Sequence, residues 1–317
     1  MPSKYVHELK EFPDLLNILA IENRIETGLI EKDYWIMQVL HGLKSQGFSF
    51  EMKGGTSLSK GYKIIHRFSE DIDIQINPPK DLGVITDPSN SKKEATESRK
   101  NYYDWLRDTI KIDGIISIER DREFDNERTY NSGGIRLHYK SFADKVDGLK
   151  EGILLEVGFD TVTPNQPLTI SSWAYERATA SGGLEITDNR AIDIACYHPG
   201  YTFVEKLQTI VTKFRREQET GKEKQNLMRQ YYDVYSLLES SLVQDFIGTD
   251  DYKKHKAARF VGKDKGAGIA ENAAFHLTDE IRQRFKERYE GTKNLYYNGQ
   301  PAFDKLLDRI HQNIGRL

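Results

Sequence analysis

The spacing of apolar and polar residues over the first 80 positions predicts one helix and two strands. Apolar side chains recur at helical spacing over residues 27–43, and Thr27 can cap that helix. Residues 48–53 alternate between apolar and polar, which predicts a strand that Gly-Gly ends. A short helix is expected over residues 56–65. Strict alternation over Asp71–Ile76 then predicts a second strand, which Pro-Pro stops.

The pattern in the middle of the chain predicts one helix and several strands, and the pattern in the last third predicts helices. After a polar, loop-like stretch, a helix is expected from Lys92 or Glu94 to Ile110. Strands are expected at 114–119, 134–139, 152–159 and 168–172, a turn at 161–168 and a loop at 181–183. Helices are expected at 201–214, 227–238, 279–289 and 302–314, and an exposed basic loop at 253–268. The change of character near 195–200 predicts an αβ domain over 1–198 and a helical domain over 199–317.

Composition narrows the class of protein. The 317 residues suffice for two domains, and 17 Tyr and 14 Phe exclude a chain that is disordered throughout. The single Cys196 excludes an internal disulfide framework and a Cys-rich zinc site. No apolar run approaches the roughly 18 residues of a membrane span, and the first residues lack the apolar stretch of a signal peptide. We therefore expect a soluble, cytoplasmic protein that does not bind membranes.

The net charge of −3 hides an uneven distribution. Residues 201–317 hold 21 basic and 17 acidic residues, whereas the rest of the chain holds 25 and 32. An acidic first part and a mildly basic last part fit a metal site beside a surface that binds a polyanion. An asymmetry this small also fits chance.

Paired carboxylates on the second predicted strand are the strongest sign of chemistry. Side chains two apart share one face of a strand, so Asp71 and Asp73 project together. Ser69 joins that face if the strand starts early. Neighbouring carboxylates repel unless a divalent cation lies between them, and hard oxygen ligands suit Mg²⁺ or Mn²⁺. The alternative is a solvated strand edge.

A third carboxylate is needed for two-metal chemistry. Glu156 is the first candidate, because it interrupts the apolar run Ile153-Leu-Leu-Glu-Val, where an inward carboxylate needs a reason. Asp160 is the second candidate. An ion pair with Lys or Arg is the other explanation for Glu156.

Gly54-Gly-Thr-Ser57 lies between the two strands and fits a phosphate cradle. Glycines allow the backbone to approach a ligand, and the N–H groups at a helix start favour phosphate. Taken alone, the same residues are a turn followed by a helix cap. A phosphate cradle and a metal-binding Asp pair, joined by one short helix, together indicate phosphoryl transfer.

This order of motifs is similar to the nucleotidyltransferase (polymerase-beta-like) fold, and more narrowly the chain resembles the AbiEii/AbiGii toxin family of type IV toxin–antitoxin and abortive-infection systems. The segments that carry the resemblance are Glu31-Lys-Asp-Tyr-Trp-Ile36, Lys53-Gly-Gly-Thr-Ser-Leu58, Arg67-Phe-Ser-Glu-Asp-Ile-Asp-Ile74, Val204-Glu-Lys-Leu207 and Arg229-Gln-Tyr-Tyr-Asp-Val-Tyr-Ser-Leu237. The resemblance implies an α+β fold, with a mixed sheet and flanking helices followed by a C-terminal helical domain.

The resemblance also implies roles for residues. Asp71 and Asp73 hold the metal ions, and Lys206 and Asp233 join the site from the helical domain. The residues expected at the nucleotide are Gly54, Gly55, Thr56, Ser57, Arg67, Ser69 and Lys206. Arg67 binds phosphate or stabilises the Asp pair. The alternatives are a solvated helix residue for Lys206 and a helical ion pair with Arg229 for Asp233.

The expected function is Mg²⁺- or Mn²⁺-dependent transfer of a nucleoside monophosphate from an NTP to an acceptor hydroxyl. The resemblance implies an RNA acceptor, the 3′ end of tRNA, and a toxin role with a cognate antitoxin. Basic stretches at 213–216 and 253–265 can receive RNA electrostatically. The alternatives are transfer to a small molecule or protein, and a nucleotide-binding partner protein without catalysis.

Overall fold

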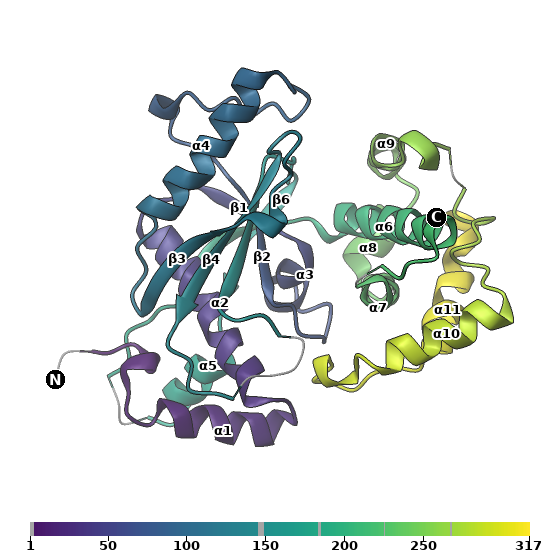
Figure 1. Cartoon of the computed structure of the whole chain (residues 1–317). Helices are drawn as coiled ribbons and strands as arrows, with labels where there is room; N and C mark the ends of the chain where they lie inside the picture. The colour runs from purple at the N-terminus through teal and green to yellow at the C-terminus, as the bar shows by residue number, and fades with distance from the viewer. Residues whose placement is uncertain (1–2, 145–148, 183–184, 225, 267) are drawn as a thin grey trace. The chain divides into compact units, whose positions relative to one another are not determined.

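A computed structural model gives the structure of residues 3–144, 149–182, 185–224, 226–266 and 268–317 (Figure 1). Internal contacts divide the chain into two units. The αβ unit comprises residues 1–61 and 68–197, and the helical unit comprises residues 62–67 and 198–317. The segment 62–67 therefore belongs with helices that follow it by more than 130 positions.

A seven-stranded mixed sheet forms the centre of the αβ unit. The strands lie in the order β3-β4-β5-β2-β1-β7-β6. Their bounds are Phe50–Lys53 (β1), Asp71–Ile76 (β2), Ile115–Asp121 (β3), Ser132–Tyr139 (β4), Ile153–Gly158 (β5), Asn165–Ile170 (β6) and Ala191–Tyr197 (β7). The pairs β1–β7 and β2–β5 are parallel, and the other pairs are antiparallel. The predicted mixed α+β sheet is confirmed.

Helices cover this sheet and close its core. They are α1 (Phe12–Asn23), α2 (Thr27–Ser45), α3 (Gly54–Thr56), α4 (Lys93–Thr109) and α5 (Trp173–Ala180), with a π-helical segment η2 (Ser57–Gly61) after α3. Helix α2 packs against β5 and β7, whereas α4 packs against β3 and β4. Most of α2 is buried, including the consecutive charged residues Glu31, Lys32 and Asp33. Such a helix lies inside the unit and needs internal partners for its charges.

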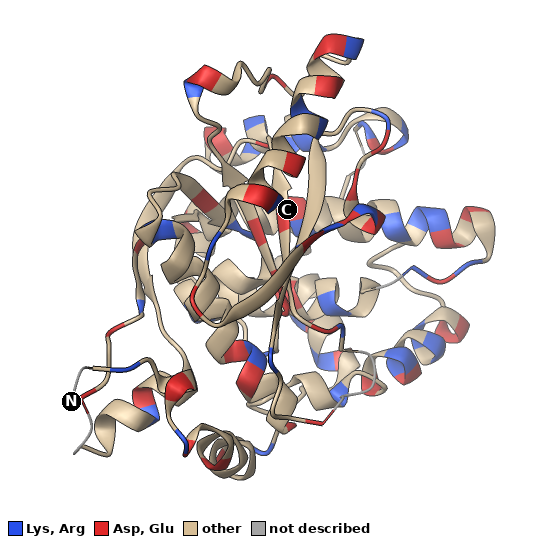
Figure 2. Ribbon diagram, turned by 60° about the vertical axis from the view of Figure 1, so that its left-hand side comes forward, with Lys and Arg blue, Asp and Glu red and all other residues tan. Residues whose placement is uncertain are grey.

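The helical unit is built around α6 and α7, whose apolar stripes pack against each other. Its helices are α6 (Pro199–Thr220), α7 (Leu227–Leu237), α8 (Ser241–Phe246), α9 (Asp250–Arg259), α10 (Asp279–Glu290) and α11 (Phe303–Asn313). Helices α10 and α11 pack against α7, and α8 and α9 pack against α6. Lys and Arg lie interspersed with Asp and Glu over both units (Figure 2).

Three predicted elements differ from the structure. The expected loop at 253–268 is wrong over its first part, because α9 runs to Arg259, with Thr249 capping it and two aspartates in its first turn. The expected turn at 161–168 is wrong in its second half, because β6 passes through Pro167. Proline is tolerated there since β6 lies at the sheet edge. The short helix expected to reach residue 65 ends at Gly61.

None of the helices within the described ranges combines the length and the apolar character needed to cross a membrane.

Candidate active site

The predicted carboxylates lie on two neighbouring strands in the middle of the sheet. Strands β2 and β5 pair in parallel, and Asp73 lies directly opposite Glu156. Residues opposite one another in a ladder share a face, so Asp71, Asp73 and Glu156 project to the same side. Ile72 and Ile74 point to the other side and are fully buried. The structure thus brings together the three candidate metal ligands.

Mutual repulsion and burial change how these carboxyls ionise. Burial, and then the charges of Glu70 and Asp73, raise the pKa of Asp71 to about 6. Burial, and then the charge of Asp73, raise the pKa of Glu156 well above its usual range. Glu156 also shares a side-chain hydrogen bond with Asp73. Burial and the neighbouring negative charges therefore favour the protonated form of Glu156 when no cation is bound.

The donor set fits a hard divalent cation. Three carboxylates offer oxygen ligands, which Mg²⁺ and Mn²⁺ prefer, and a bound cation would favour the ionised form of Glu156. Within the described residues, no three His, Cys, Asp or Glu side chains are already grouped as a ligand set.

Binding of Mg²⁺ is expected to release protons at pH 7 and to weaken as the pH falls through about 6, since Asp71 and Glu156 must ionise. The free energy of unfolding has the opposite pH dependence. Without metal, the raised pKa values of Asp71 and Glu156 stabilise the fold at low pH, and this stabilisation is lost as the pH rises through their folded-state pKa values. Calorimetry in buffers of different ionisation enthalpy counts the protons that are released when Mg²⁺ binds. Glu156→Gln should release fewer protons than the wild type. Equal Mg²⁺ affinity at about pH 5.5 and pH 8 would contradict the expected pH dependence of metal binding.

The Gly-Gly-Thr-Ser turn positions the carboxylates. Gly54 has a φ of +74°, and a Cβ atom there would overlap the carboxylate of Asp73. The hydroxyl of Thr56 donates a hydrogen bond to the backbone carbonyl of Asp71. Gly55 is buried, and Ser57 is buried beside Cys196. The turn is thus bound to the start of β2, and the phosphate role of these residues stays a prediction.

Gly54→Ala is expected to lower transfer activity about 100-fold, because the added methyl must displace the Asp73 carboxylate, and misplacement by about 1 Å can cost that much. The matched control is Gly83→Ala. Gly83 also has a positive φ, +60°, but a Cβ atom there meets nothing within 4 Å. The control should lose about 1 kcal/mol of stability and keep its activity. Equal activity of the two variants would contradict this account.

A cavity of about 310 Å³ opens beside Asp73 and Glu156. Lys53, Asn131 and Asp160 also line it. The ammonium of Lys53 lies 3.3 Å from Oδ2 of Asp160, whereas Glu156 faces Asp73 across the ladder. This geometry favours Glu156 over Asp160 as the third carboxylate. Asn131 had no predicted role, because it reaches this cavity only through the pairing of β4, which follows it, with β5.

Charged residues of α2 brace the elements around the carboxylates. The ammonium of Lys32 lies 2.7 Å from the carbonyl of Lys150 and 3.4 Å from a carboxylate oxygen of Glu70, the residue before β2. Asp33 accepts from Lys60 at the end of η2. These partners satisfy buried charges and tie α2 to both sides of the Asp pair, which supports a positioning role.

In the helical unit, the buried residues Arg67 and Asp233 and the half-buried Lys206 form one charged cluster. Arg67 donates from Nε and Nη2 to both oxygens of Asp233, at 2.6 and 2.7 Å, and Nζ of Lys206 lies 3.0 Å away from Oδ2. Burial opposes ionisation of Asp233, but the charges of Arg67 and Lys206 outweigh it and hold its pKa below the usual value. Asp233 is 0 % exposed and is the counterion that these two cations share. Ser69 is half-buried just before β2.

Comparisons with known proteins place the chain in a family. No curated protein matches its sequence. One solved structure that it resembles is an antigenic nucleotidyltransferase-like protein from Paracoccidioides brasiliensis, with 12% identity and a TM-score of 0.37 over 74% of this chain and 94% of that one. The profile of the family described as "Nucleotidyl transferase AbiEii toxin, Type IV TA system" matches residues 42–309. The segment 31–36 lies outside that match, and the other segments of the resemblance lie within it. The chain belongs to the AbiEii family of nucleotidyl transferase toxins of type IV toxin–antitoxin systems.

Proposed function

We propose that the αβ unit transfers a nucleoside monophosphate from an NTP to an acceptor hydroxyl, with a divalent cation held by Asp71, Asp73 and Glu156. The observation that carries this proposal is the register of β2 and β5, which sets Glu156 opposite Asp73 on the face that Asp71 shares. Membership of a nucleotidyl transferase family supports the class of reaction.

In this proposal, residues of the chain accept the proton of the acceptor hydroxyl and orient the substrates. A bound Mg²⁺ or Mn²⁺ would neutralise negative charge on the triphosphate and on the reacting phosphorus. Asp73 or Glu156 takes the proton of the acceptor hydroxyl, whose oxygen forms a bond to the α-phosphorus. The bond between the α-phosphorus and the bridging oxygen breaks, and pyrophosphate leaves with the electron pair. Catalysis then rests on positioning and electrostatics.

The cavity beside the carboxylates is a suitable place for part of the substrate. Its volume of about 310 Å³ is at the small end of ligand pockets, so it holds one portion of a nucleotide or acceptor. The ammonium group of Lys53 places a positive charge at the wall of this cavity. The contacts of Gly55, Thr56, Ser57, Arg67, Ser69 and Lys206 with phosphates remain proposals that rest on the family resemblance.

The acceptor that we propose is RNA, at the 3′ end of tRNA, and the toxin role implies a cognate antitoxin. Support comes from the family, whose description names a type IV toxin–antitoxin system. A cytoplasmic location, where NTPs and tRNA occur, is part of the same proposal.

The test is to incubate the purified protein with Mg²⁺, total tRNA and each α-³²P NTP in turn, beside the double variant Asp71→Ala/Asp73→Ala. Label on RNA with the wild type alone would support transfer to RNA and name the base. Label on a protein or a small molecule would contradict the RNA acceptor and still support nucleotidyl transfer. Metal-dependent NTP binding without any labelled product would overturn the enzymatic proposal in favour of a nucleotide-binding partner protein.

A further inference from the structure

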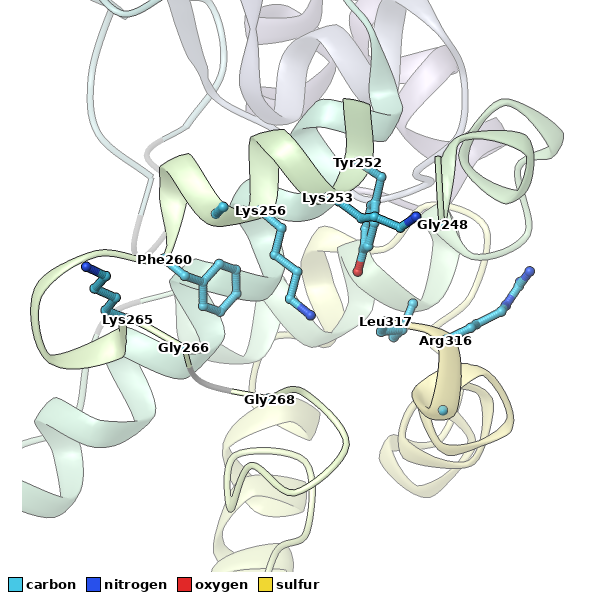
Figure 3. Close-up of a pocket in the computed structure, with 12 residues that line it drawn as sticks. Gly248, Tyr252, Lys253, Lys256, Phe260, Lys265, Gly266, Gly268, Arg316 and Leu317 are labelled. Atoms are coloured by element: carbon cyan, nitrogen blue, oxygen red, sulfur yellow. The ribbon is translucent and has the colours of Figure 1, made fainter. Parts of the chain in front are cut away.

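The helical unit contains a second and larger cavity, whose lining includes lysines of the basic stretch 253–265. It has a volume of about 630 Å³ and lies between α9, the loop after it and the last residues of the chain (Figure 3). Of the described residues that line it, four are basic and none is acidic: Lys253, Lys256, Lys265 and Arg316. The remaining lining is glycine or apolar and aromatic side chains. A cavity of this size holds a whole small ligand.

Lys256 places a positive charge on the wall of this cavity. It is half-buried, and among the described residues its ammonium forms no ion pair within 4 Å. It lies instead 5.9 Å from the ring centroid of Tyr252 and 6.0 Å from that of Phe260. Burial lowers the pKa of Lys256, against an opposing effect of the Glu271 charge. A partly desolvated ammonium on aromatic rings favours an incoming anion.

Tyr252 provides an independent indication of a ligand. Its side chain is 3 % exposed, and its hydroxyl is buried without a hydrogen-bond partner in the described structure. Figure 3 shows the hydroxyl end pointing toward the space between Lys256 and Leu317. A buried hydroxyl without a partner costs free energy, which a polar group of a ligand would recover. The cavity therefore offers both a donor and cations.

We propose that this cavity binds a nucleoside phosphate, with the phosphate at Lys256 and Lys265 and the base against the apolar wall formed by Ala257 and Phe260. Lysines bind phosphate as point charges, and an apolar or aromatic wall suits a flat base whatever its sequence. The ligand is either a free nucleotide or one nucleotide of an RNA strand, since the chemistry is the same. This proposal does not rest on the transfer reaction of the αβ unit.

The experiment is isothermal calorimetry on the full chain in EDTA, which removes divalent cations from the carboxylate site. The probes are AMP, GMP, CMP and UMP, each alone, and a single-stranded RNA decamer. Lys256→Gln/Lys265→Gln is expected to weaken binding about tenfold or more, whereas Lys305→Gln, an exposed lysine of α11 outside the cavity and outside the basic stretch 253–265, should change it less than twofold. Circular dichroism verifies that each variant is folded.

A second pair of variants tests occupancy of the cavity. Ala257→Trp puts a large ring into the space and should abolish binding, whereas Ala258→Trp, on the next exposed residue outside it, should not. Binding of mononucleotides alone would support a site for a free nucleotide, and binding of the decamer alone would support a site for a strand. No saturable binding of any probe to the wild type, or equal binding by Ala257→Trp and the wild type, would overturn the proposal.

Discussion

Asp73→Asn is expected to lower nucleotidyl transfer at least about 1,000-fold and to leave the protein folded. Asp73 lies against Gly54 and opposite Glu156, so its charge is central to the proposed cation site. Loss of one ligand charge removes several kcal/mol of stabilisation from the reacting phosphorus, and about 4 kcal/mol corresponds to that factor. The measurement is the initial rate of label transfer under saturating NTP and Mg²⁺.

Asp160→Asn is the matched control for Asp73→Asn. It removes a carboxylate from the wall of the same cavity, but one that pairs with Lys53 instead of facing the other two aspartates. We expect a loss of less than about tenfold, since one partly exposed ion pair contributes little. An Asp73→Asn enzyme with more than a tenth of the wild-type rate would contradict the assignment. So would an equal loss in the control.

Asp233→Ala is expected to destabilise the helical unit by about 3–5 kcal/mol, because it removes the counterion that the buried Arg67 shares with the half-buried Lys206. The same change in Asp308, an exposed residue of α11, should stay within about 0.5 kcal/mol. Thermal unfolding of the full chain by circular dichroism measures both. The account predicts a lower-temperature transition for Asp233→Ala alone.

This pair of variants also separates positioning from catalysis for Asp233. If Asp233 acts by holding Arg67 and Lys206, the activity of Asp233→Ala should fall in parallel with the fraction unfolded as the temperature rises. A variant that is as stable as the wild type yet inactive would contradict the positioning role. It would then favour direct participation in the reaction.

The sequence predicted the carboxylates because their signal is local. Strict alternation over Asp71–Ile76 gives the strand and the shared face, and an acidic residue inside the apolar run of β5 identifies Glu156. What no local pattern contains is the pairing of β2 with β5, which sets Glu156 opposite Asp73. Asn131 reaches the cavity through another tertiary pairing, that of β4 with β5, and was therefore not predicted either.

Long-range contacts and caps account for the other differences. Arg67 and Asp233 are 166 positions apart, and no period or spacing links them, so their ion pair was not predicted, and helical spacing offered only Arg229 as an alternative partner of Asp233. The basic stretch after residue 253 suggested a loop, because its glycines and lysines outweighed the cap at Thr249 and the acidic first turn. Capping residues would have been the better guide to where α9 begins.

The most direct test of the central claim is anomalous diffraction from a crystal of the protein soaked in Mn²⁺ with a non-hydrolysable NTP. The account predicts a manganese peak at bonding distance from carboxylate oxygens of Asp71 and Asp73, with Glu156 as a further ligand, and predicts its loss in an Asp73→Asn crystal. A crystal with the nucleotide bound and manganese absent from these carboxylates would contradict the claim that they hold the catalytic cation.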